Sequence, residues 1–138
     1  MAEAFQAAGN LISGIGGYEA GRFNKRMSDT EAVEIERAGA IEEGRVRDAA
    51  RMAIGEQVAA QGSNGFAQGT GSALDALTQS QVNATLDAMN VRQQAAQRAR
   101  AARVSGRIAL AQGNNALTAG MVGAAGNAVD WASKRKYG

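Results

Sequence analysis

The chain has 138 residues, enough for one domain, and 45% of them are apolar, although only 4% are aromatic. It has no cysteine and no histidine, which excludes a disulfide framework, thiolate chemistry and imidazole catalysis and removes the commonest transition-metal ligand. The net charge of +2 is too small to indicate DNA binding by itself, and the lack of proline suits long unbroken helices.

Residues 1–21 form an N-terminal segment of small residues, and its start does not resemble a secretory signal because no basic run precedes the apolar part. At helical spacing its large side chains form a loose stripe made of Phe5, Leu11, Ile12, Ile15 and Tyr18. Its glycines weaken a helix by roughly 1 kcal/mol each relative to alanine but permit close backbone approach, and Gly17 and Gly21 have GxxxG spacing. Residues 4–18 are too few to span a bilayer, which takes about 20 residues. Two interpretations stay open: a packed or frayed helix end, and a segment that lies on a membrane surface.

Residues 22–61 are expected to form one long helix. Apolar residues recur every eleven positions, in the series Met27, Ala38, Ala49 and Ala60 and in the pair Ile35 and Val46. This period favours a straight or slightly right-handed pairing of helices. Val33, Ile54 and Val58 fall on another side, and a helix with two apolar sides must meet more than one neighbour.

Residues 62–71 are expected to be a glycine-rich turn, because glycine allows positive φ and Ser, Asn and Thr bond locally to the backbone. Gly62 suits the position after a helix end, and Ser72 suits an N-cap. Phe66 is expected to fold back against the helices. A phosphate-binding loop is disfavoured because no strand precedes the glycines and no GKS or GKT follows them. The residues assigned to this turn are Gly62, Gly65, Gly69, Gly71 and Ser72.

Residues 72–107 are expected to form the returning helix. A buried seam with three-four spacing is formed by Leu74, Leu77, Gln81, Ala84, Ala88, Val91 and Ala95. A second stripe consists of Val82, Leu86 and Met89.

Charge supports the same pairing, because residues 29–43 carry a net charge of −5 and residues 92–107 carry +5. If the chain folds back near Phe66, the numbers of paired residues add up to about 133, which places Glu34 near Ala99. Exposed ion pairs contribute only about 0 to 1 kcal/mol each, so their expected role is register. The rival interpretation, nucleic-acid binding by the arginines, lacks interleaved aromatic residues, and only non-specific DNA contact is expected. The inter-helix charges are assigned to Glu31, Glu34 and Glu36 and to Arg98, Arg100 and Arg103.

Residues 108–138 form a Gly- and Ala-rich C-terminal segment with a basic end, and no charge occurs between Ile108 and Val129. That stretch is long enough to cross a hydrocarbon core, but its Asn and Gln residues disfavour insertion of a lone helix. Two interpretations stay open: a helix buried between subunits, and a segment that becomes membrane-active when released. Together with Phe5, Leu11, Ile12 and Ile15, the residues assigned to membrane or oligomer contacts are Gly113, Gly120, Gly123, Gly126 and Trp131.

The expected fold is therefore all-α, a single domain of residues 1–138 built as a long antiparallel helical hairpin with a Gly-rich turn. Alanine-rich helices bury little area each, and a lone hairpin has no second layer to cover its outer faces. We expect a homo-oligomer, in the form of a ring or bundle.

The layout of residues 25–110 resembles the small internal virion proteins, or ejection proteins, of short-tailed, podovirus-type bacteriophages. The likeness is most specific at residues 54–77, where IGEQVAAQGSNG leads through a short Gly/Ser loop to GSALDAL. The resemblance implies storage in the internal core of the virion beside the portal and larger internal virion proteins, followed by ejection through the tail. It also implies a contribution to an outer-membrane channel for DNA delivery. It brings no catalytic residue, metal or cofactor.

The leading interpretation is thus a non-enzymatic component of a phage DNA-ejection apparatus, located in the virion interior and then in the host cell envelope. A helical-hairpin adaptor, or a secreted interaction protein without membrane activity, is the alternative. A basic DNA-packing protein is a weaker third possibility.

Overall fold

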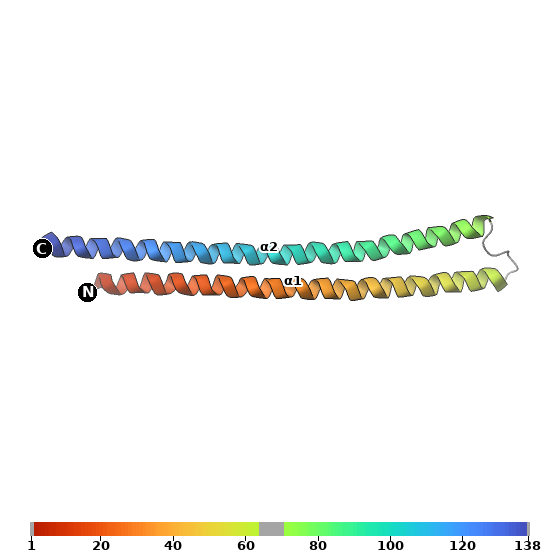
Figure 1. Cartoon of the computed structure of the whole chain (residues 1–138), viewed down its shortest axis with the longest axis horizontal. Coiled ribbons are helices and arrows are strands. Elements are labelled where there is room, and N and C mark those ends of the chain that lie inside the picture. Colours follow the sequence, from red (N-terminus) through yellow and green to blue (C-terminus); the bar gives the residue numbers. More distant parts are fainter. Residues whose placement is uncertain (1, 64–70, 138) are drawn as a thin grey trace. The chain divides into compact units, whose positions relative to one another are not determined.

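The computed structural model describes residues 2–63 and 71–137, and within them the side chains of residues 5–134 and 136. These residues form two helices, α1 (Ala2–Ser63) and α2 (Gly71–Tyr137), and no strand occurs in the two described ranges (Figure 1). The helices pack against each other, as expected for a helical hairpin. The all-α prediction is confirmed.

The helices extend beyond the predicted boundaries. Residues 1–21 and 22–61 were expected to be separate segments, but α1 runs without a break from Ala2, and α2 likewise continues through residues 108–137. Gly62 does not follow the helix end as predicted, because α1 ends at Ser63, whose hydroxyl donates to the Ala60 carbonyl at 2.9 Å.

At the start of α2 the prediction also needs correction. The helix begins at Gly71, so Ser72 is its second residue rather than the cap before it. Gly71 has a φ of +58°, a left-handed conformation in which only glycine avoids a steric penalty. The other predicted turn residues Gly65 and Gly69, and Phe66, lie outside the described residues.

The chain divides into two compact units, the first formed by Met1–Ala32 with Arg100–Gly138 and the second by Val33–Ala99. Each unit contains a part of α1 and a part of α2. The two units use different spacings at the contact between the helices.

In the first unit the helices meet along glycines that recur every seven residues. Gly14 lies against Gly120 and Gly21 against Gly113, and a Cβ atom on Gly21 would lie 3.0 Å from the Cα atom of Gly113. Gly106 continues the series, with Ser28 opposite it. The residue numbers in each of these pairs add up to 134, one more than the predicted 133. A seven-residue interval on both helices is that of a left-handed coiled coil.

In the second unit the spacing at the contact is eleven residues. Ala88 and Ala99 have no exposed surface, and Ile35 and Val46, also eleven apart, are half-buried on α1. Gly39 contacts Ala95, a pair whose numbers again add up to 134. The predicted eleven-residue period is thus present at the contact between the helices in this unit.

The other eleven-residue series does not lie at a contact between the helices. Met27, Ala38, Ala49 and Ala60 are all exposed, and so are Leu74 and Gln81 from the predicted seam of the second helix. The remaining seam residues, Leu77, Ala84, Ala88, Val91 and Ala95, are buried or half-buried. Each helix therefore contacts the other along one narrow stripe on a single side, where the small residues lie.

The core is made of very small side chains. The buried hydrophobic residues are all alanines, Ala32, Ala88, Ala99 and Ala124, and no large side chain is fully buried among the described residues. The accessible surface is 9848 Å², whereas the scaling law for folded monomers predicts roughly 6,800 Å² for a chain of 14.2 kDa. Much of the apolar surface is therefore available to neighbouring molecules.

Candidate assembly surfaces

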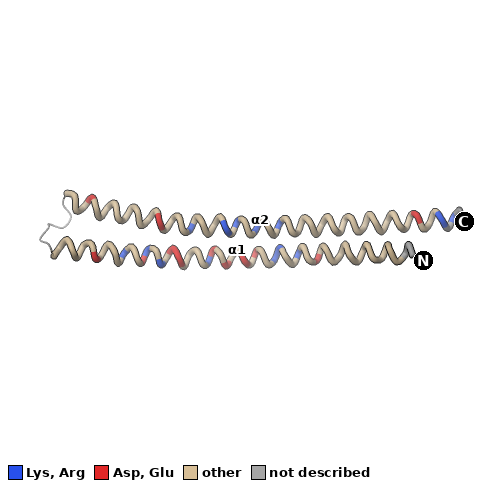
Figure 2. The backbone as a smooth tube through the Cα atoms, turned by 180° about the vertical axis from the view of Figure 1, so that it is seen from behind, with Lys and Arg blue, Asp and Glu red and all other residues tan. Residues whose placement is uncertain are grey.

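Charged residues lie mainly in the middle of each helix, and α2 carries further charges near its start and at its C-terminal end. Figure 2 shows the acidic and basic residues of α1 and the arginines of α2, with long uncharged stretches toward the chain ends. Most ion pairs are local. Glu42 pairs with Arg45 at 3.5 Å and Asp48 with Arg51 at 3.2 Å, at the (i, i+3) spacing that brings side chains together on a helix.

One ion pair joins the helices within the second unit. The Glu43 carboxylate lies 4.0 Å from the Arg92 guanidinium and also accepts hydrogen bonds from Arg47, the shorter at 2.7 Å. The side chain of Glu43 is only 13% exposed but that of Arg92 is 77% exposed, so water still screens this pair. The numbers of Glu43 and Arg92 add up to 135, close to the register of the glycine pairs.

The six residues predicted to carry inter-helix charge are divided between the units. Glu34, Glu36 and Arg98 belong to the second unit, and the others to the first. Arg103 is half-buried and the other five residues are exposed. Arg103 and Glu36 each take part in an interaction with another group. Glu43 belongs to the predicted acidic block but was not assigned to a pair. The sequence does indicate its local ion pair, because Arg47 follows four residues later.

The glycines predicted to serve assembly have different surroundings. Gly113 and Gly120 are used inside the first unit, since a Cβ atom on Gly120 would lie 2.6 Å from the Asn10 carbonyl oxygen. A Cβ on Gly123 would meet only the Asn10 side chain, and one on Gly126 would meet nothing within 4 Å. Sequence reasoning missed the contacts of Gly39 and Gly106. The seven-residue recurrence of Gly106, Gly113 and Gly120 is the signal that could have found the second of these.

The large side chains assigned to membrane or oligomer contacts lie at the surface. Phe5 is 78% exposed and Ile12 is 72% exposed, and Leu11, Ile15 and Trp131 are exposed to a smaller degree. In the described parts of the chain, neither helix contains a stretch that is both long and apolar enough to cross a membrane.

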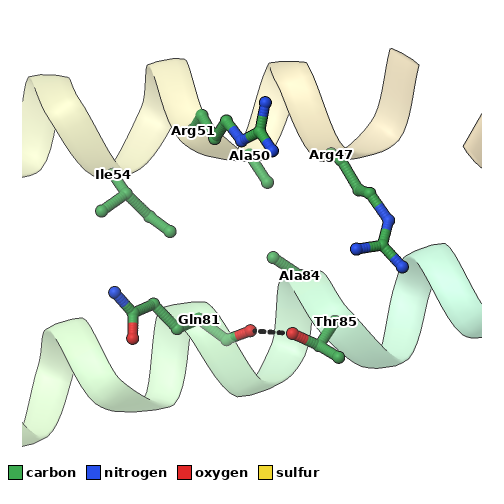
Figure 3. A pocket seen from close by; sticks show the side chains of 7 residues that line it. All are labelled: Arg47, Ala50, Arg51, Ile54, Gln81, Ala84 and Thr85. Carbon is green, nitrogen blue, oxygen red and sulfur yellow. Dashed lines mark hydrogen bonds between the residues drawn. The ribbon is translucent and has the colours of Figure 1, made fainter. Parts of the chain in front are cut away.

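A groove between the helices of the second unit offers no reactive group. Figure 3 shows Arg47, Ala50, Arg51 and Ile54 of α1 facing Gln81, Ala84 and Thr85 of α2. Both arginines are paired with acidic residues of their own helix, and the Thr85 hydroxyl donates to the Gln81 carbonyl at 2.8 Å. The groove therefore presents no activated nucleophile and no unpaired cation.

The described residues contain no cluster of acidic side chains that could hold a metal ion. The features that stand out are instead surfaces: a glycine-lined contact inside the first unit, and exposed apolar side chains on the outer sides of both helices. Such surfaces bind other helices or lipid. Comparison with protein-family models, curated proteins and solved structures finds no match to this chain.

Proposed function

We propose that this protein is a non-enzymatic structural subunit of a bacteriophage DNA-ejection apparatus. It is stored as a homo-oligomer in the internal core of the virion beside the portal, is ejected into the host, and contributes there to a membrane-spanning channel. The larger internal virion proteins are its neighbours in the core. DNA contact is non-specific.

The observation that carries the proposal is the composition of the core. Among the described residues the buried hydrophobic side chains are all alanines, while large side chains such as Phe5, Ile12 and Val122 remain exposed. Apolar area is worth roughly 25 cal/mol per Å² once it is covered, so a chain with this core gains most of its further stability from neighbours. A subunit that is completed only by its assembly suits a particle component better than an independent enzyme. The sequence resemblance of residues 25–110 supplies the kind of particle.

The channel part of the proposal concerns the uncharged segments, residues 4–18 and 108–129. In lipid, every polar group needs a partner, and the Asn side chains of the second segment need neighbouring chains to supply one. Glycine and alanine let such chains approach closely, both in a packed particle and in a membrane. The two states thus use the same small residues.

Two experiments test the proposal. Particles of a phage that encodes the chain should contain it inside the capsid, so that antibodies label it only after the capsid is opened. Absence from purified particles would overturn the virion assignment. Purified protein should also release dye from liposomes, and the same buffer without protein is the control.

The alternative is a helical-hairpin adaptor or secreted interaction protein. The same exposed apolar residues favour it, since they fit a groove on another protein as well as another copy of this chain. Failure to release dye from liposomes of any lipid composition, together with absence from virions, would decide for it.

A further inference from the structure

The outer side of α2 carries a second helical seam that none of the described residues covers. Between residues 101 and 132 two series recur every seven residues and interleave at alternating steps of three and four. The first series is Ala101, Ile108, Asn115, Val122 and Val129. The second series is Val104, Ala111, Thr118, Ala125 and Ala132. This is the spacing of the a and d positions of a coiled coil, continued through more than four heptads.

All ten residues of this outer seam are exposed. Ile108 is 54% exposed, and Val122 and Val129 are each 67% exposed. They lie away from the positions that contact α1 in the same unit, where Gly106, Gly113 and Gly120 are buried. The helix therefore has two seams with the same seven-residue period, of which the chain itself uses one.

The residues of the outer seam have the chemistry of a helix contact. Isoleucine and valine are the branched side chains that suit a positions of parallel two-stranded coiled coils, and a single Asn at an a position fixes register. An Asn side chain has both donors and acceptors, so two copies of Asn115 can bond to each other. Thr118 adds little polarity to the seam, because its hydroxyl already donates to the Asn114 carbonyl at 3.0 Å.

Charge favours a second copy in parallel orientation. In a parallel pair the flanking positions bring Arg100 beside Ser105 and Arg107 beside Gln112, so no two like charges face each other. In an antiparallel pair centred on Asn115 and Thr118, the basic end of one copy (KRK at residues 134–136) would lie alongside the stretch with Arg98 and Arg100 of the other copy, where the net charges repel.

The area is sufficient for a specific contact. Residues 101–132 span roughly 48 Å at a helical rise of 1.5 Å, and helices pack about 10 Å apart. The two copies together would cover on the order of 1,000 Å², the lower limit of specific interfaces.

We infer that two copies of this chain associate through the outer seam of α2, in parallel and in register, with Asn115 of one copy against Asn115 of the other. The inference rests on the self-assembly stated in the proposed function and names the face that performs it. The contact is a two-fold one, in which the same patch of each copy is used. The exposed apolar residues of α1 remain outside it.

Introduced cysteines test this inference directly, because the chain has none of its own. In a parallel, in-register pair residue 122 meets itself, so V122C should form a covalent dimer with a short bismaleimide under native conditions. The matched control is I41C, an aliphatic position on α1 that is 60% exposed and is assigned to no contact, and it should stay uncrosslinked. Circular dichroism checks that both variants keep the helical signal.

A second measurement uses charge at the same two positions. V122D should raise the dissociation constant of the dimer by roughly tenfold or more in sedimentation equilibrium, since it places two carboxylates in one desolvated layer. I41D should leave it within about a factor of two, the small effect expected of a surface position.

Three results would overturn the inference. Crosslinking between A111C and V122C, without dimer of V122C alone, would mean antiparallel pairing. Crosslinking between I12C and V122C would mean that the outer seam docks on α1 of the next copy, in which case self-assembly stands and this face pairing falls. A chain that sediments as a monomer up to its solubility limit would overturn the pairing and the self-assembly of the proposed function together, whereas dye release and virion content test that function independently.

Discussion

Gly14 and Gly120 meet backbone to backbone, so that a Cβ atom on Gly120 would lie 2.9 Å from the Cα atom of Gly14. Real Cβ atoms do not approach that closely, and the obstruction is main chain, which cannot rotate aside. Each glycine weakens its helix by roughly 1 kcal/mol relative to alanine, and the close approach of the two helices is what the chain obtains from it.

The first prediction compares this glycine with one that has no neighbour. G120A should lower the free energy of unfolding by about 1 to 3 kcal/mol, because the helices must separate to admit the methyl group. G126A should raise it by up to about 1 kcal/mol, since nothing lies within 4 Å of its Cβ and only helix propensity changes. Urea unfolding followed by circular dichroism measures both. Equal effects of the two changes would mean that close glycine packing is not what holds the first unit together.

The glycine contact of the second unit yields a reciprocal prediction. Gly39 lies against the Ala95 methyl group, so G39A should be destabilising by about 1 to 3 kcal/mol. In the double variant G39A/A95G the methyl group moves to the other helix and the space is restored, so stability should return to within about 1 kcal/mol of the original. Additive losses in that double variant would contradict the contact.

The contacts of Gly106, Gly113 and Gly120 were not predicted from the sequence, although the helices and their register were. Helix type followed from apolar spacing, and the register followed within one residue from the expected fold-back near Phe66, with the opposed charge blocks in support. The pairing partners of the glycines did not follow, because a glycine inside a helical pattern first reads as a weak point. Its value appears only when the opposite backbone, such as the Asn10 carbonyl, is in place.

The inter-helix charges were predicted at residues 31–36 and 98–103, and Glu43 was left out of that assignment. The acidic block was cut at residue 43, directly before Arg45 and Arg47, and those arginines lie at the spacing that forms local pairs. The contact of Glu43 with Arg92, at the edge of the block, was therefore not anticipated. The end of α1 also differs from the prediction. Gly62 lies inside the helix, and the hydroxyl of the last helical residue, Ser63, donates a hydrogen bond to the Ala60 carbonyl.

The ion pair between Glu43 and Arg92 gives a third prediction. E43R should lower the unfolding midpoint because it gathers three arginines, while R92E should do so less, since the Arg92 side chain is 77% exposed. The double change E43R/R92E should recover part of the loss, with a coupling free energy of about 0 to 1 kcal/mol that shrinks at high salt. A coupling free energy of zero at low salt would show that the pair does not contribute to register.

A fourth prediction concerns the start of α2. Gly71 has a left-handed backbone, so G71A should cost about 1 to 2 kcal/mol in the free energy of unfolding. The matched control is G55A, in the interior of α1 with nothing within 4 Å, which should be neutral or stabilising. If G71A proved stabilising, this helix start would not need a positive φ.

The fifth prediction addresses the uncharged segments at the chain ends. F5S/I12S should leave the helical signal unchanged, because both side chains are exposed, but it should reduce dye release from liposomes. V82S/L86S removes two exposed apolar residues from the second unit and serves as the control that should leave release intact. Equal loss in both variants would show that apolar surface in general, rather than the segment of residues 4–18, acts on the membrane.

The antiparallel pairing of the two helices has a mechanical consequence. Gln57 and Ser80, near the middle of the sequence, are 23 residues apart, whereas Gly14 pairs with Gly120 from near the opposite terminus. Both chain ends belong to the first unit. Tension that draws them apart loads the contacts of that unit one layer at a time, starting at the chain ends, and separates its two helix segments in order. Each layer holds only a few small side chains, so the force needed at any moment is low, and the layers re-form in reverse order because the short-range pairs close first at the smallest entropic cost. Opening at low force is what the proposed ejection through a tail requires.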